Sequence, residues 1–121
     1  MKCINKNIGN FGENLALEFL INKNHKLLTR NFKKRNGEID LITTIDDILV
    51  FTEVKTRYSN KYGYPSESVN YSKQNTIKNT ASYFIYLNNL YNINVRFDVI
   101  EIFLNHYDES HKIIHIEDAF R

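Results

Sequence analysis

The sequence has few of the residues that cross-link chains and no long apolar run. Its one cysteine, Cys3, excludes an internal disulfide and a cysteine-based zinc site. No apolar stretch approaches the roughly 20 residues that span a bilayer, and the first residues lack the apolar centre of a secretory signal. A glycine-rich phosphate loop is also missing. We therefore expect a cytoplasmic protein that is stable without cross-links.

What is present is typical of one globular domain, which we expect to span residues 1–121. Hydrophobic residues make up 42% of the chain and charged residues 25%, which argues against disorder. The net charge of +2 says little about partners, but Lys33-Lys34-Arg35 is a tight basic cluster while many acids lie near turns and the C-terminus. This segregation suits phosphate binding. Composition alone favours the other interpretation, a set of ordinary solvated lysines.

Apolar periodicity predicts the elements. After a flexible segment over 9–12, helical spacing indicates a helix over about 13–23, and Pro65 is well placed to open a second helix that ends near residue 89. Runs rich in β-branched and apolar residues predict strands over 26–32, 37–44, 48–56, 95–104 and 113–116. The fold class is therefore α/β, with a mixed β-sheet flanked by helices in the order α-β-β-β-α-β-β.

The predicted hairpin over 37–56 brings two acids together. If the turn is centred on Asp46-Asp47, Asp40 lies opposite Glu53, and Glu38 lies opposite Lys55. Opposed carboxylates about 5 Å apart repel by roughly 3 kcal/mol at an effective dielectric of 20. A divalent cation would offset this repulsion, since Mg²⁺ is held by one or two carboxylates together with water and substrate phosphates.

The faces of this hairpin indicate a cleft. One face carries apolar residues, and the charged face also continues into apolar residues; the first set is Ile39, Leu41, Val50 and Val54, and the second is Ile42, Leu49 and Phe51. The charged residues thus begin where the hairpin stops being covered by apolar packing, which is the position expected for the rim of a cleft. The alternative is a solvent-exposed face with a Glu38–Lys55 ion pair worth at most about 1 kcal/mol. Glu13 adds a third carboxylate, or it only interacts with its helix dipole.

The spacing of Asp40 and Glu53-Val54-Lys55 resembles the PD-(D/E)xK nuclease motif, although Ile39 stands where that motif often has proline. More specifically, the chain resembles the bacterial YraN family, whose members are regarded as endonucleases. The matching segments cover almost the whole chain: Gly9-x-x-Gly12-Glu13, Arg30-Asn31, residues 37–42, residues 51–57, Gly63-Tyr64-Pro65, Lys73, residues 96–100 and Ala119-Phe120. The resemblance implies a restriction-endonuclease-like core.

The resemblance also implies a chemistry. Asp40, Glu53 and the Val54 carbonyl would bind Mg²⁺ or Mn²⁺, with Glu13 completing the shell directly or through water. Lys55 would orient or deprotonate the attacking water and stabilise the transition state, leaving a 5′-phosphate and a 3′-hydroxyl. Because the family is similar to archaeal Holliday-junction resolvases, the implied substrate is DNA, in branched or otherwise structured form.

Further residues are candidates for contacts with nucleic acid. Lys33, Lys34, Arg35 and Arg57 suit the phosphate backbone, and the resemblance adds Lys73 from the second helix. We expect Arg96 and Asp98 to form a buried ion pair and expect no zinc site at His111 and His115, since they lie in a strand-like segment. The alternative function is a non-catalytic nucleic-acid-binding or adaptor domain, and the assembly is open between a monomer and a homodimer.

Overall fold

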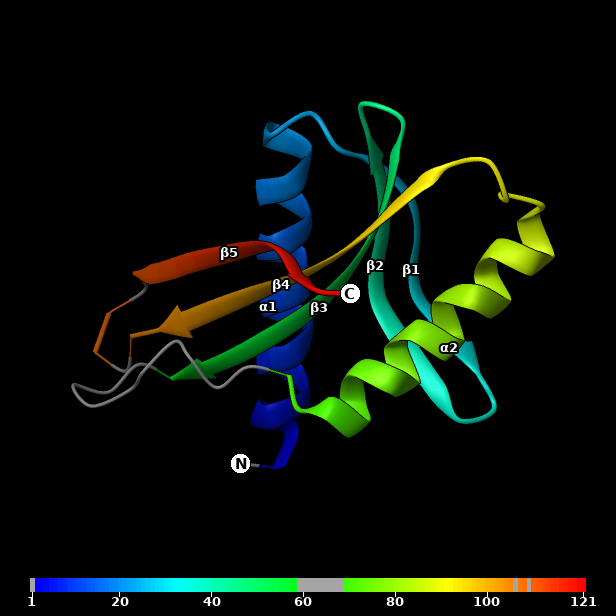
Figure 1. Cartoon of the computed structure of the whole chain (residues 1–121). Coiled ribbons are helices and arrows are strands. Elements are labelled where there is room, and N and C mark those ends of the chain that lie inside the picture. Colours follow the sequence, from blue (N-terminus) through cyan, green and yellow to red (C-terminus); the bar gives the residue numbers. More distant parts are fainter. Residues whose placement is uncertain (1, 59–68, 106, 109) are drawn as a thin grey trace.

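The computed structural model describes residues 2–58, 69–105, 107–108 and 110–121, in which two helices flank one five-stranded sheet (Figure 1). The element order α-β-β-β-α-β-β is confirmed. The elements are α1 (Lys2–Asn22), β1 (Lys26–Lys34), β2 (Gly37–Ile45), β3 (Ile48–Tyr58), α2 (Tyr71–Asn88), β4 (Asn94–Leu104) and β5 (His111–Phe120). Among the described residues, no helix is long and apolar enough to cross a membrane.

The sheet follows the chain order β1-β2-β3-β4-β5, so that β3 lies at its centre. Neighbouring strands are antiparallel except β3 and β4, which run parallel from Ile48↔Asn94 to Tyr58↔Leu104. A parallel pair needs a crossover connection, and α2 lies within this one. Figure 1 shows that the sheet is strongly twisted, with β1 and β2 rotated away from the direction of β3, β4 and β5.

The two helices cover opposite faces of the sheet. On the α2 side, Ile42, Phe51 and Val99 pack with Ile77 and Phe84; on the α1 side, Leu41, Ile100 and Ile102 pack with Ala16 and Leu20. Side-chain alternation along each strand produces this division. The prediction that Ile39 shares a face with Leu41 is wrong, because Ile39 packs in the α2-side cluster. β2 stays paired with β1 back to Gly37, but its pairing with β3 begins only at Leu41, and strict alternation of faces breaks between Ile39 and Leu41.

The N-terminal helix is longer than predicted. Residues 9–12, expected as a flexible segment, are helical, and α1 begins at Lys2. Gly12 is needed there because α1 approaches β3 closely: a Cβ at Gly12 would overlap the Thr56 hydroxyl and lie 2.8 Å from the Thr56 Cβ. The glycine that sequence reasoning read as a loop signal is therefore a packing requirement inside a helix.

The second helix begins at Tyr71, where the Asn70 side chain accepts a 2.8 Å hydrogen bond from the Lys73 backbone N–H. This is an ordinary N-cap, which satisfies one of the first helical N–H groups. Pro65, the predicted start, lies outside the described residues. The buried face of α2 consists of Ile77, Thr80, Ala81 and Phe84.

Candidate active site

The candidate site lies where β2 and β3 separate. The predicted hairpin register is confirmed from Ile45↔Ile48 to Leu41↔Thr52, but among the described residues the ladder ends there. Asp40 and Glu53 are therefore not a ladder pair as predicted. Here the Asp40 side chain, and not a backbone carbonyl of β2, accepts the hydrogen bond from β3: its Oδ2 accepts a 2.8 Å hydrogen bond from the Val54 backbone N–H. This bond fixes the carboxylate of Asp40 against β3, beside Glu53.

The two acids influence each other strongly. The pKa of Asp40 is raised from 3.8 to about 7, most of all by burial, then by the charge of Glu53 and by a hydrogen bond shared between the two carboxyl groups. The charge of Glu38 adds to this, whereas the Val54 N–H opposes it. Two carboxylates thus converge at the end of the hairpin, and one of them holds its proton near neutral pH. The predicted convergence of charge is present, although the predicted Glu38–Lys55 opposition lies beyond the paired segment.

Glu13 reaches the same region from α1. It lies within the helix rather than in its first turn, so the alternative explanation by the helix dipole does not apply. Its Oε1 is 3.6 Å from the Arg30 Nη2, and Asn31 donates a hydrogen bond to its carboxylate. Burial and then the charge of Asp40 raise the pKa of Glu13. The helix therefore lies over the hairpin, as a role at the site requires, but its carboxylate is held by β1.

Among the described residues, no third direct metal ligand joins Asp40 and Glu53. Within the described part of the chain, no three His, Cys, Asp or Glu side chains are grouped so that they could hold a metal ion together. The acidic site is thus a pair, Asp40 with Glu53, and Glu13 lies at its border. Asp and Glu oxygens are hard ligands of the kind that Mg²⁺ and Mn²⁺ take, and a pair suits a cation that keeps water or phosphate oxygens in its remaining positions.

Lys73, which the family resemblance gave as a candidate for phosphate contact, lies beside Glu53. Its Nζ is 3.5 Å from the Glu53 Oε2, and its side chain is 47% exposed while that of Glu53 is 12% exposed. The N-cap of α2 places Lys73 in the first turn, directed toward β3. Because the pair is open to solvent on the lysine side, it stabilises the fold by at most about 1 kcal/mol. Lys73 can therefore leave Glu53 for a phosphate at little cost.

Lys55 and Arg57 follow Glu53 along the same face of β3. Lys55 is partly buried and lies opposite Glu101 in the parallel register, and the Arg57 Nη2 is 3.6 Å from the Glu101 Oε2. Sequence reasoning missed Glu101, whose side chain is only 1% exposed. The available signal was an acid within the apolar run Val99-Ile100-Glu101-Ile102-Phe103. Arg57 is thus held by the protein as well as being a candidate for phosphate contact.

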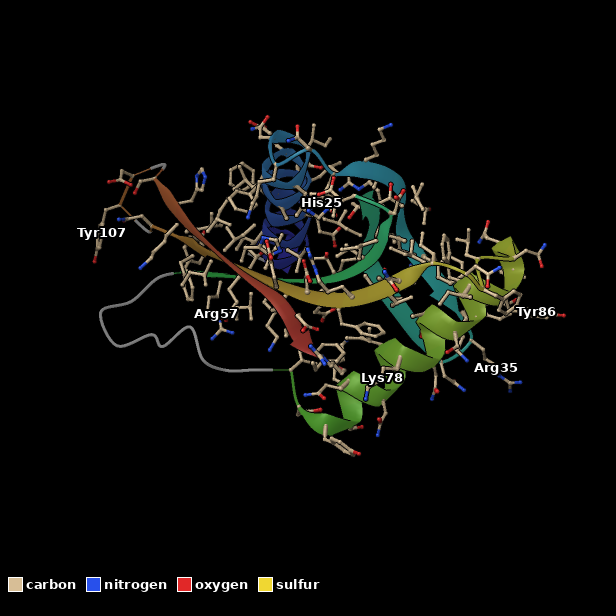
Figure 2. The ribbon with its side chains drawn as sticks, turned by 45° about the horizontal axis from the view of Figure 1, so that its top comes forward. His25, Arg35, Arg57, Lys78, Tyr86 and Tyr107 are labelled. Atoms are coloured by element: carbon tan, nitrogen blue, oxygen red, sulfur yellow. The ribbon has the colours of Figure 1, made fainter. Side chains whose placement is uncertain are left out.

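A cleft lies beside Glu13 and Arg57, but Asp40, Glu53, Lys55 and Lys73 are not among the residues that line it. It has a volume of about 360 Å³, lies between α1 and β3, and is lined by Ile8, Gly9, Glu13, Val54, Thr56, Arg57 and Tyr58. Glu13 and Val54, both predicted for the metal shell, therefore border the same hollow as Arg57. In Figure 2, Arg57 projects from β3 on the side of the sheet away from α1. The basic cluster Lys33-Lys34-Arg35 lies elsewhere, in and after β1 beside α2, where the Lys34 Nζ is 6.0 Å from the Tyr83 ring centroid.

The Arg96–Asp98 ion pair is present as predicted, with Nε–Oδ1 and Nη2–Oδ2 distances of 2.8 and 2.9 Å. His115, which sequence reasoning did not connect to it, contributes a 2.8 Å contact from Nε2 to the Asp98 Oδ2, and the Asp118 N–H donates to Oδ1. Although burial raises the pKa of Asp98, these bonds hold it below its usual value. This network ties β5 to β4 and belongs to the fold rather than to the candidate site.

The chain is similar to known proteins over most of its length. The model of the uncharacterised protein family UPF0102 matches residues 12–102. A UPF0102 protein of Clostridium botulinum (strain Alaska E43 / Type E3) is 57% identical over 122 residues, covering 100% of this chain and 99% of that protein. UPF0102 proteins of Clostridium novyi (strain NT) and Clostridium tetani (strain Massachusetts / E88) are 49% and 48% identical, with 99% and 100% of this chain covered and 100% and 99% of those proteins. These names state no activity.

Proposed function

Because the chain belongs to the uncharacterised protein family UPF0102, whose name assigns no chemistry, we propose from its own residues that it is a divalent-metal-dependent endonuclease that hydrolyses phosphodiester bonds in DNA. The observation that carries this proposal is the convergence of Asp40 and Glu53, with the pKa of Asp40 raised to about 7. A fold keeps two repelling, partly buried acids together at a cost, and a bound cation would remove that cost.

The site fits Mg²⁺ or Mn²⁺ by the chemistry of its donors. Asp40 and Glu53 would hold the ion with the backbone carbonyl of Val54, and Glu13 would act through water. When bound, the ion supplies a Lewis acid for a nonbridging phosphate oxygen and favours deprotonation of the attacking water. The hydrogen bond from Val54 N–H to Asp40 keeps this carboxylate in place before the ion arrives.

The remaining steps fall to side chains of β3 and α2. Lys55 lies two residues after Glu53 on the same face, so its ammonium would stabilise the charge that develops as water attacks phosphorus. The new bond joins water oxygen to phosphorus, the phosphorus–O3′ bond breaks, and the leaving oxygen takes a proton. Lys73 would move from Glu53 to the phosphate, which exchanges one anionic partner for another.

The likeness to the PD-(D/E)xK motif supports the same proposal, because Asp40, Glu53 and Lys55 occupy the motif positions in order. Its relation to restriction-endonuclease cores and Holliday-junction resolvases favours structured or branched DNA as substrate. We propose a cytoplasmic setting for this activity, since that is where such DNA would be met.

The test combines metal binding with cleavage. We expect calorimetry to detect Mg²⁺ or Mn²⁺ binding to the wild type and not to Asp40→Asn. We also expect the wild type, but not Asp40→Asn, to cut junction, flap, single-stranded or linear duplex DNA. Asp47→Asn, the same change at an exposed position in the β2–β3 turn, is the control and should behave as wild type. Equal activity in wild type and Asp40→Asn would reveal a contaminant or a wrong site. DNA binding by a protein that takes up neither metal would favour the adaptor function instead.

A further inference from the structure

Two segments without acidic residues lie beside the candidate site, although Glu38 of β2 lies opposite Lys33 in the strand register. Residues 26–37 and 69–95 contain no Asp or Glu, although the whole chain has a net charge of only +2. The two segments pack together, since Phe32 of β1 contacts the rings of Tyr83 and Phe84 of α2. Their cations are Lys26, Arg30, Lys33, Lys34, Arg35, Lys73 and Lys78. Lys73 contacts Glu53 on the α2 side of the sheet, so the basic segment of α2 begins at the candidate site, whereas Arg30 contacts Glu13 on the α1 side.

Exposed tyrosines lie on the same surface. Tyr83 is 41% exposed and Tyr86 is 64% exposed, and the two are one helical turn apart on α2. The Tyr83 ring is backed by Phe32, with ring centroids 6.1 Å apart, and the Lys34 Nζ lies 6.0 Å from its centroid. Its orientation is therefore fixed by packing. Figure 2 shows Arg35 and Tyr86 at the same end of the molecule.

An apolar hollow adjoins these rings. It has a volume of about 550 Å³ and is lined by Leu28, Thr29, Phe32, Phe84, Asn88 and Leu90. Phe32 and Phe84 thus form its wall and also pack with each other, while Thr29 and Asn88 add polar groups. Such a mixture of apolar walls and a few polar groups is typical of pockets for planar organic groups.

Basic side chains combined with exposed, rigid aromatic rings are characteristic of surfaces that bind single-stranded nucleic acid. A duplex offers its phosphates to such a surface but keeps its bases stacked on each other. An unpaired strand offers both phosphates and base faces. The rings on α2 and the hollow beside them match the base faces of an unpaired strand, and the absence of acids along both segments matches the negative charge of its phosphates.

We propose that the surface of β1 and α2 binds an unpaired segment of DNA, with bases stacked on Tyr83 and Tyr86 and phosphates on the Lys33-Lys34-Arg35 cluster. The inference rests on the proposed function for the position of the cut, and it names the substrate class: DNA with a single-stranded stretch beside the scissile bond. Lys73 and Tyr86 are 13 residues apart on α2, and a helix rises 1.5 Å per residue, so the bound segment would extend about 20 Å from the site.

The experiment measures binding by fluorescence anisotropy of a labelled oligothymidine and of a blunt duplex of equal length, with Ca²⁺ as the only divalent ion. We expect Tyr83→Ala and Tyr86→Ala each to weaken single-strand binding about 5- to 150-fold, the range of base–aromatic stacking, while duplex binding changes less than about twofold. Tyr83→Phe and Tyr86→Phe keep the ring and should bind as wild type. Tyr86 is the more exposed of the two, so Tyr86→Ala keeps the test valid if Tyr83→Ala loses its packing on Phe32.

Tyr107→Ala is the matched control, because Tyr107 is 97% exposed and lies at the opposite end of the molecule from Tyr86 (Figure 2). Unchanged single-strand binding in both alanine variants would overturn the proposal, as would an equal loss in Tyr107→Ala. Tighter binding of oligouridine than of oligothymidine would overturn the assignment to DNA. These readouts need no cleavage, so a wild type that binds single strands through its tyrosines but cuts nothing would refute only the nuclease function.

Discussion

Replacing Asp40 by asparagine should stabilise the metal-free protein at neutral pH. The folded state raises the pKa of Asp40 from 3.8 to about 7, and each pKa unit corresponds to 1.36 kcal/mol, so ionising this group at pH 7 costs about 4 kcal/mol of stability. An asparagine removes the charge, keeps an oxygen acceptor for the Val54 N–H, and offers its amide N–H to Glu53. Allowing for incomplete hydrogen bonding of the buried amide, we expect a gain of about 2–4 kcal/mol.

The pH dependence has a definite sign. Because the folded-state pKa is raised, the folded protein binds more protons than the unfolded chain between pH 4 and pH 7, and the free energy of unfolding falls as pH rises through this window. Below about pH 4, Asp40 is protonated in both states and the full stability is present. The advantage of Asp40→Asn should therefore be small at pH 4 and should reach its maximum above pH 7.

The assay is urea denaturation in the presence of a chelator, at pH 4, 6 and 8, with Asp47→Asn as the control in the same hairpin. A rise in the midpoint with unchanged slope reports stability alone. Adding Mg²⁺ should then stabilise the wild type by an amount that rises with the logarithm of the Mg²⁺ concentration above Kd, and should leave Asp40→Asn unaffected. If Asp40→Asn is no more stable than wild type at pH 8, and both show the same pH profile, the two carboxylates do not repel and the argument for a cation site fails.

Three further predictions concern other parts of the molecule. Lys55→Ala should slow single-turnover cleavage about 100-fold or more at saturating enzyme, whereas Lys34→Ala should only weaken binding and reduce its salt slope by about 1; equal rates of chemistry would remove Lys55 from catalysis. Asp98→Ala should lower the free energy of unfolding by about 3–5 kcal/mol, because it removes a fully buried carboxylate that pairs with Arg96 and contacts His115; a loss below 1 kcal/mol in urea denaturation would contradict this. Gly12→Ala should destabilise by about 1–3 kcal/mol through overlap with β3, while Gly9→Ala, where a Cβ meets no described atom within 4 Å, should stabilise α1 by about 0.5–1 kcal/mol; thermal melts that rank the pair in the other order would refute the close approach.

The strands and their order could be predicted from the sequence because apolar alternation is a local signal. The turn at Asp46-Asp47 fixed the hairpin register correctly as far as Leu41↔Thr52. At the next position the predicted pairing of Asp40 with Glu53 was wrong, since strand alternation cannot reveal that the Asp40 side chain replaces a backbone carbonyl as the hydrogen-bond acceptor. The position of Ile39 was wrong for the same reason.

The N-terminal half of α1 was missed because glycine signals a loop in the absence of tertiary context. Position 12 of the helix is occupied by glycine because Thr56 of the neighbouring strand leaves no room for a larger residue. Glu101 was missed likewise, because its Arg57 partner is recognisable only once β3 and β4 are known to run parallel. The family resemblance gave Lys73 only as a candidate for phosphate contact, and its position beside Glu53 could not be predicted, since an isolated helical lysine carries no signal of its own.

The hydrogen bond between the Val54 N–H and the Asp40 carboxylate has a consequence for spectroscopy. A backbone amide in the middle of a sheet normally donates to another amide, whose electronic state does not change with pH or ligand. The Val54 amide donates to a group that loses a proton near pH 7. Its nuclear magnetic resonance should therefore report both the titration of Asp40 and the arrival of any cation, so that a single cross-peak of the unmodified protein reads out the chemical state of the site.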